Sequence, residues 1–129
     1  MNAPLPDHLL PEIRLRDTPP ALLEALKARF AERCSLALVV REQHGRDESS
    51  FAAPPPAAVV FAESTADVAD AVKLASRYNV PVIPFGVGTS LEGHLLAVQG
   101  GISIDVSRMN QVLAINAEDL TVTVQPGVT

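Results

Sequence analysis

The 129-residue sequence has no tryptophan, one tyrosine, four phenylalanines and a single cysteine. One cysteine excludes an intramolecular disulfide and any metal site built from several cysteines. Because 47% of the residues are hydrophobic and so few are aromatic, the core must consist mainly of small aliphatic side chains. A chain of this length suits one domain, which would bury about two-thirds of its unfolded surface.

Long apolar runs and an excess of positive charge are also absent. No segment approaches the ~18 consecutive apolar residues of a membrane-spanning helix. The net charge of −5 argues against nucleic-acid binding, for which a basic face is typical. The first residues, MNAPLPDHLLPEIRLRD, lack the basic start and apolar stretch of a signal peptide, and their acidic residues fit an organelle transit peptide poorly. We therefore expect a cytoplasmic protein with no membrane span and no nucleic-acid partner.

The N-terminal part, residues 1–53, is predicted to be an arm followed by a helical region. Five prolines within residues 1–20 indicate an extended arm. A Thr-Pro-Pro sequence then opens a helix with apolar residues at 3.6 spacing, which runs to about Arg33. The apolar stretch 34–40 fits either a strand or a second, buried helix, and the polar residues 44–50 predict a loop.

Three consecutive prolines at 54–56 form a stiff connector, and the boundary to a second part, residues 54–129, is predicted here. In that part, residues 57–62 are typical of a buried strand. Ser64 is placed to cap a helix, and a further short strand follows at 81–85. A strand, a helix and a strand with short links predict a βαβ unit whose two strands are parallel.

Further strands are predicted at 102–106, 112–115 and 120–125, each separated from the next by a turn. The last of them alternates apolar and polar residues, which is typical of a half-buried strand. The predicted fold class is α+β, with an N-terminal helical region followed by the βαβ unit and these strands. Because the chain reaches Thr129 directly after a turn, we expect it to be the truncated N-terminal part of a longer domain.

The segment from Pro84 to His94, PFGVGTSLEGH, carries the strongest chemical signal. Three glycines allow backbone N–H groups to converge and an anion to approach without a Cβ in the way. Thr89 and Ser90 add hydroxyl donors, so the loop suits a pyrophosphate. A glycine-rich turn that merely connects two strands is the alternative.

A nicotinamide-dinucleotide fingerprint fits this segment less well. Gly86 and Gly88 follow a strand, and Asp105 lies 19 residues after Gly86, where a ribose-binding acid is expected. However, Leu91 occupies the position of the third glycine. The predicted helix also precedes the loop instead of following it.

The chain resembles the FAD-binding domain of the flavoenzyme family that includes vanillyl-alcohol oxidase and p-cresol methylhydroxylase, the PCMH-type domain. Within it, the similarity is to the group of D-lactate dehydrogenase (cytochrome) and the FAD subunit of glycolate oxidase. PFGVGTSLEG together with the final VQPGV is the specific part of the likeness. The segments that carry it are REQHGRDESS at 41–50, PPPAAVVFAESTADVADAVKLA at 54–75, VPVIPFGVGTSLEG at 80–93 and VQGGISIDVSRMNQVLAINAEDLTVTVQPGVT at 98–129.

The resemblance implies FAD as the cofactor and a first subdomain of the PCMH-type domain as the fold. Some relatives attach the flavin through a histidine in this loop, but Thr89 stands at the matching position, which implies non-covalent FAD. The resemblance also implies that the substrate-binding and catalytic residues lie in parts that this chain does not contain. The implied cofactor contacts are Phe85, Gly86, Val87, Gly88, Thr89, Ser90 and Leu91, together with Pro126 and Gly127.

Four other residues have more than one interpretation. His94 follows the matched loop, where a structural role is favoured over cofactor contact. His44 and Asp47 belong either to a polar structural loop or to the rim of an active site. Cys34 lies among apolar neighbours and is interpreted as a small buried side chain, not a reactive thiol.

Two functions of different classes are consistent with the sequence. The first is the N-terminal piece of an FAD-dependent oxidoreductase that oxidises a 2-hydroxy acid of the D-lactate or glycolate type and passes electrons to an external acceptor. In this case the 129 residues alone would be inactive, and neither a catalytic residue nor a metal ligand is assigned to them. The second is a stand-alone module that binds a nucleotide or a partner chain. Strand edges left unpaired after Gly101 would favour self-association or pairing with a partner.

Overall fold

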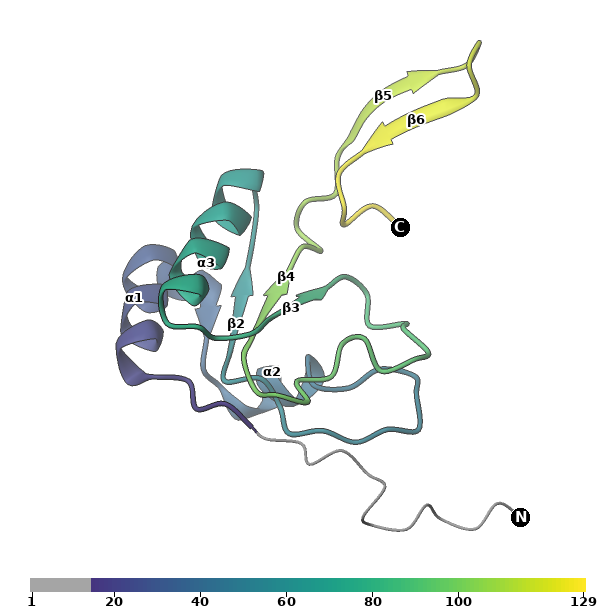
Figure 1. The fold of residues 1–129 in the computed structure, drawn as a ribbon. Coiled ribbons are helices and arrows are strands. Elements are labelled where there is room, and N and C mark those ends of the chain that lie inside the picture. The colour runs from purple at the N-terminus through teal and green to yellow at the C-terminus, as the bar shows by residue number, and fades with distance from the viewer. Residues whose placement is uncertain (1–14) are drawn as a thin grey trace, which may run out of the picture.

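The computed structural model describes residues 15–129, so most of the predicted N-terminal arm lies outside the described residues (Figure 1). The helices are α1 (Pro20–Phe30), the 3-10 helix η2 (Ala31–Arg33), α2 (Leu38–Gln43) and α3 (Thr65–Arg77). The strands are β1 (Cys34–Ser35), β2 (Ala58–Phe61), β3 (Val82–Phe85), β4 (Ile102–Asp105), β5 (Val112–Asn116) and β6 (Thr121–Val124).

Four strands form one sheet in the order β1-β2-β4-β3, and β5 and β6 form a separate hairpin. Strands β2 and β3 both run parallel to β4, whereas β1 is antiparallel to β2. The predicted βαβ unit β2-α3-β3 is therefore present with parallel strands. The two strands are not neighbours, because β4 lies between them.

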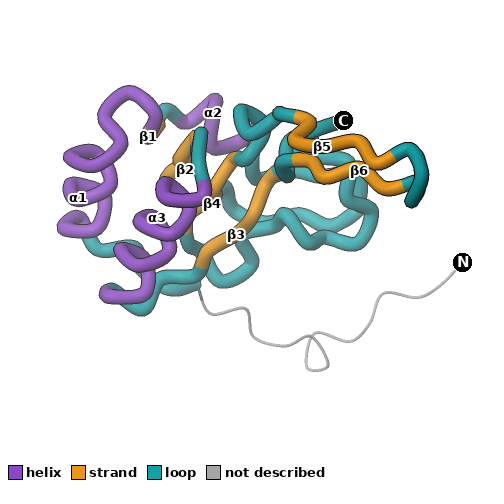
Figure 2. Tube along the Cα trace, turned by 90° about the horizontal axis from the view of Figure 1, so that it is seen from above, coloured by secondary structure: helices purple, strands orange, loops and turns teal. Residues whose placement is uncertain are grey.

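The core lies between the sheet and helices α1 and α3. Figure 2 shows these two helices together on one side of the sheet, with the long loops on the other side. Alanines in α3 and β2 allow the helix to approach the sheet closely, which fits a core with few aromatic residues. The cluster includes Leu22, Leu26, Phe30, Cys34, Ala58, Val60, Ala71, Ala75, Ile102 and Ile104.

Most sequence predictions for the elements are confirmed. Helix α3 begins after Ser64, whose hydroxyl accepts the backbone N–H of Asp67 at 3.2 Å. The stretch 34–40 is partly a strand and partly a helix, because β1 ends at Ser35 and α2 begins at Leu38. Helix α2 has no buried residue, so the prediction of a buried helix is wrong. Cys34 is fully buried, and burial raises the pKa of its thiol, as expected of a structural side chain.

The β5–β6 hairpin projects away from the sheet (Figure 1). All residues of both strands are exposed, including Ile115 and Val122, which lie opposite each other. The prediction that the strand at 120–125 is half-buried is therefore wrong, because all four residues of β6 are exposed. Its alternating pattern is real, but no other described segment covers the apolar face.

After the hairpin, the Pro126-Gly127 turn packs against the turn at 106–109. The N–H of Gly127 donates to the Met109 carbonyl at 2.8 Å. A Cβ at position 127 would overlap the carbonyl oxygen of Val106 and lie 2.9 Å from those of Ser107 and Met109. Only glycine allows this close approach of two backbones.

Helices α1 and α3 are joined by a charge cluster around Asp67, which is 5% exposed. Its carboxylate accepts hydrogen bonds from Arg33 and, at 3.1 Å, from Arg29. The hydrogen bond from Arg33 is the main reason why the pKa of Asp67 falls to about 2. The pairing therefore stabilises the fold fully above the ordinary pKa of an aspartate and is lost as pH falls through about 2.

We predict that Asp67→Asn lowers the free energy of unfolding by about 2 kcal/mol at pH 7, since one pKa unit corresponds to about 1.4 kcal/mol. Urea unfolding of both proteins at pH 7, 4 and 2 measures this. The difference should shrink as the wild-type carboxylate is protonated. Equal stability at pH 7 would show that the charge cluster contributes nothing.

We predict that Gly127→Ala detaches the C-terminal turn, because the added Cβ has no room beside Val106. Hydrogen exchange of the Gly127 amide, which the Met109 carbonyl protects in the wild type, should accelerate in the variant. Gly86→Ala is the matched control, because a Cβ at position 86 meets no atom within 4 Å. Unchanged exchange at position 127 in the alanine variant would contradict the tight packing.

Candidate functional site

Three parallel strands end together at one edge of the sheet. Phe61 of β2 and Phe85 of β3 are both in register with Asp105 of β4. In open sheets of parallel strands, ligands bind outside the carboxyl ends of the strands. The segment between β3 and β4, residues 86–101, leaves the sheet at this edge and contains the glycine loop.

The glycine loop has the backbone geometry that glycine permits. Gly88 has φ of +79° and Gly93 has φ of +77°, in the left-handed region that side chains disfavour. A Cβ at position 88 would lie 3.1 Å from the tip of the Phe85 ring. In contrast, the space beside Gly86 is open, so a ligand can reach the backbone there without meeting a side chain.

The backbone N–H groups of residues 86–92 have no acceptor within hydrogen-bond geometry among the residues that the structure describes. Residues 86–92 are exposed or half-buried, so water or a ligand can accept hydrogen bonds from these groups. The Ser90 carbonyl accepts the N–H of Glu48 at 3.0 Å, and the Ser90 hydroxyl lies 2.9 Å from Nδ1 of His94. The loop is thus held from one side while its N–H groups stay available.

The predicted loop contacts differ in their exposure. Phe85 is half-buried beneath the loop and contacts the ring of His44, with a centroid distance of 4.2 Å. Thr89 is exposed, and Val87 and Leu91 are 59% and 72% exposed. Exposed apolar side chains beside free N–H groups suit a ligand with both a charged and an apolar part.

The structure brings the Pro126-Gly127 turn to the same edge. The turn at 106–109 lies between it and the glycine loop, since Val106 donates its N–H to the Phe85 carbonyl at 2.9 Å and Gly127 bonds to Met109. The two predicted parts of the site therefore flank one turn, although no hydrogen bond joins them directly.

A buried pair of side chains, His44 and Asp105, lies beneath this edge. His44 and Asp105 are 6% and 4% exposed, and Nε2 of His44 lies 2.8 Å from a carboxylate oxygen of Asp105. Asp105 therefore cannot serve as a free ribose-binding acid. Residues 86–101 also contain no helix that could present its N-terminus to a phosphate, so the geometry disfavours a nicotinamide-dinucleotide site. Nothing in the local sequence marks the pair, because β4 alternates apolar and polar residues and Ser103 is as polar a position as Asp105.

The polar loop at 44–50 braces the glycine loop. Asp47 accepts the N–H and the hydroxyl of Ser49, and these hydrogen bonds lower the pKa of its carboxyl. The neighbouring Glu48 makes the backbone bond to Ser90. His94 is largely exposed; its Nδ1 lies 2.9 Å from the Ser90 hydroxyl, and its Nε2 lies 4.0 Å from a carboxylate oxygen of Glu92.

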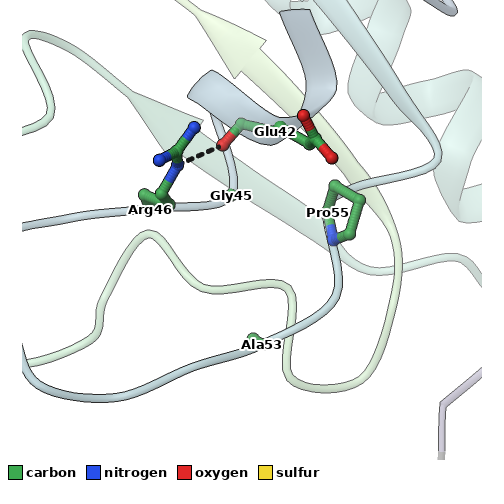
Figure 3. A pocket seen from close by; sticks show the side chains of 5 residues that line it. All are labelled: Glu42, Gly45, Arg46, Ala53 and Pro55. Carbon is green, nitrogen blue, oxygen red and sulfur yellow. Dashed lines mark hydrogen bonds between the residues drawn. The ribbon is translucent and has the colours of Figure 1, made fainter. Parts of the chain in front are cut away.

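A cavity of about 330 Å³ lies behind the polar loop, lined by Glu42, Gly45, Arg46, Ala53 and Pro55 (Figure 3). Nε of Arg46 donates to the backbone carbonyl of Glu42 at 3.3 Å. The Glu42 carboxylate at its rim disfavours a phosphate.

In the described part of the chain, no group of three or more His, Cys, Asp or Glu side chains is arranged to hold a metal ion. None of the helices described has the length and apolar character to cross a membrane.

Comparison with known proteins identifies the family. The sequence profile of the FAD binding domain matches residues 56–129. The probable mitochondrial D-lactate dehydrogenase of Danio rerio is 48% identical over 98 residues, which cover 76% of this chain and 20% of that protein. The mitochondrial D-lactate dehydrogenase [cytochrome] of Arabidopsis thaliana is 37% identical over 115 residues, or 88% of this chain and 20% of that protein. Glycolate oxidase subunit GlcD of Bacillus subtilis (strain 168) is 38% identical over 89 residues, or 65% of this chain and 19% of that protein.

Solved structures agree with this assignment. Alkyldihydroxyacetonephosphate synthase superposes with a TM-score of 0.75 at 28% identity, covering 88% of this chain and 26% of that one. p-Cresol methylhydroxylase, at 20% identity, shares the fold with a TM-score of 0.73 over 84% of this chain and 22% of its own. The chain spans about a fifth of the length of the curated relatives named above. Both the resemblance and the α+β fold class read from the sequence are thereby confirmed, and the chain belongs to the FAD-binding domain family with FAD as its cofactor.

Proposed function

We propose that the glycine loop binds the pyrophosphate of FAD. The observation that carries the proposal is the run of backbone N–H groups at 86–92 without protein acceptors, beside the open space at Gly86. Several converging donors with no side chain in the way are what a pyrophosphate requires. No carboxylate side chain occurs from Phe85 to Leu91, and the side chain of the next acid, Glu92, is 82% exposed.

The residues of the edge fit the rest of the cofactor as well. Thr89 and Ser90 add hydroxyl donors, and the exposed Val87 and Leu91 offer apolar contact to the rings. Pro126 and Gly127 would approach the cofactor from the other side of the 106–109 turn. A threonine at the position of the flavin-linking histidine supports non-covalent binding. When bound, FAD supplies the hydride acceptor, and this chain supplies its position.

We further propose that the whole protein oxidises a 2-hydroxy acid of the D-lactate or glycolate type. The names of the relatives support this class: they include D-lactate dehydrogenases, a glycolate oxidase subunit and D-2-hydroxyglutarate dehydrogenases. No residue described here is assigned as the catalytic base. The electron acceptor, the cytoplasmic location and the domain boundary at residue 54 stay predictions.

The second function, a module that pairs with another chain, has one observation in its favour. The β5–β6 hairpin exposes Leu113, Ile115, Leu120 and Val122, each more than half accessible. Such a surface and its free strand edges suit packing against further polypeptide. Gel filtration of the chain over a range of concentrations tests self-association directly.

We predict that Gly88→Asp abolishes FAD retention, because the new carboxylate would meet the phosphates at close range. Gly88→Asn is the matched control, since asparagine has the same size, tolerates positive φ and carries no charge. Flavin absorbance after gel filtration measures retention, with NAD as the control ligand.

The aspartate variant should lose FAD while the asparagine variant keeps most of it. Equal, normal retention by both would refute the placement of the pyrophosphate. Equal loss by both would show that the site rejects any side chain at position 88 and that charge is secondary.

A further inference from the structure

His44 lies outside residues 56–129, which match the profile of the FAD binding domain. Its side chain nevertheless reaches Asp105 at the carboxyl ends of β2, β3 and β4, which we call the cofactor edge because the predicted FAD contacts lie there. It follows the last turn of α2, and its Nδ1 lies 2.8 Å from the carbonyl oxygen of Val40. Its Nε2 lies 2.8 Å from Oδ2 of Asp105. The ring also contacts Phe85 at a centroid distance of 4.2 Å and meets the edge of Phe61 at 5.6 Å.

These contacts determine the protonation of the ring. A carbonyl oxygen only accepts, so Nδ1 must carry a proton. If Nε2 carried none, its lone pair would face a carboxylate oxygen at 2.8 Å, which is repulsive. One proton therefore lies between Nε2 and the Asp105 carboxyl, and the opposite shifts of the two pKa values, upward for His44 and downward for Asp105, place it on His44 as an imidazolium.

The electrostatics agree with this assignment. Burial lowers the pKa of His44, but the hydrogen bonds to Asp105 and Val40 outweigh it, and the net direction is upward. Burial raises the pKa of Asp105, but hydrogen bonds from His44 and Ser107 outweigh it, and the net direction is downward.

Other charged side chains near the pair are directed elsewhere. On α2, Arg41 donates to the Pro56 carbonyl. Arg46, after α2, donates to the Glu42 carbonyl, and beyond β4 Arg108 pairs with Glu63 and lies over the Phe61 ring. Among the described residues, Asp105 is thus the charge that faces His44.

The pair fixes the two segments that carry the FAD contacts. Phe85, which packs on the His44 ring, is the residue from which the glycine loop starts. The other carboxylate oxygen of Asp105 accepts the N–H of Ser107 at 2.7 Å and so holds the 106–109 turn, on which Gly127 packs. One buried ion pair therefore contacts the bases of both predicted halves of the site.

We propose that His44 is a positioning residue for the cofactor edge and that its deprotonation loosens the glycine loop and weakens FAD binding. This inference rests on the proposed function only in naming FAD as the ligand. The sign follows from the geometry: the pairing is intact while the imidazolium persists, and it is lost as pH rises through the pKa of His44 in the folded protein.

The first readout needs no cofactor. Histidine ring resonances and the amide resonances of Gly86, Gly88 and Ser107 are followed by NMR between pH 5 and 10 in the full chain. In the wild type, the amides should shift with the same midpoint as the His44 ring, above the ordinary value for histidine.

Two variants separate the charge from the packing. Asp105→Asn presents an amide donor to neutral Nε2 while its oxygen still accepts from Ser107, so the midpoint of His44 should move below its ordinary value. His44→Gln keeps a donor to Asp105 without titrating, so the amides should lose the midpoint that they share with the His44 ring. Asp67→Asn is the control. It removes a carboxylate that is about as buried as Asp105 but lies on the opposite face of the sheet, so it should leave the loop titration unchanged.

The second readout is FAD affinity as a function of pH in the same proteins. For the wild type, affinity should fall across the His44 midpoint, by at most about tenfold for each unit by which its pKa is raised. In His44→Gln this fall in affinity should be absent. If no protein binds FAD, the proposed function fails while the NMR titration still decides the inference. The inference would be overturned if the loop amides did not shift at the His44 midpoint, or if that midpoint did not fall in Asp105→Asn.

Discussion

The insertion of β4 between β2 and β3 is the constraint on which the rest of this structure depends. Parallel pairing on both sides of β4 makes three strands end at one edge. The glycine loop follows β3 at that edge, and the 106–109 turn follows β4 at the same edge. Because both start from hydrogen-bonded strand ends, their relative position is set by the sheet and not by the loops themselves.

The two faces of the sheet have different roles. On one face, small side chains and the Asp67 cluster join α1 and α3 to the strands, which supplies stability. On the other face, His44 and Asp105 tie the strand ends to α2, while the polar loop at 44–50 holds the glycine loop through Glu48. The glycine loop itself can then leave its N–H groups without protein partners, because its scaffold does not depend on them.

Much of the fold follows from local patterns in the sequence. The Ser64 cap and the apolar stripe of α1 act within a few residues, and the structure has both where they were predicted. The order of the strands could not be read, because it depends on β4 pairing with strands that are 44 and 20 residues away in sequence, as Ala58↔Ile102 and Val82↔Ile102 show. The His44–Asp105 pair spans 61 residues and has no local signature. The exposure of β6 could not be predicted from the sequence either. The alternation of apolar and polar residues shows which face of the strand is apolar, but it does not show what covers that face.

The most direct test of this account is to add FAD to the isotopically labelled chain and follow the backbone amides of residues 86–92. We predict that these amides shift and become protected from exchange, while amides of α1 and α3 do not change, and that NAD at the same concentration has a smaller effect. Retention of FAD with no change at residues 86–92 would place the cofactor elsewhere and contradict the assignment of the glycine loop.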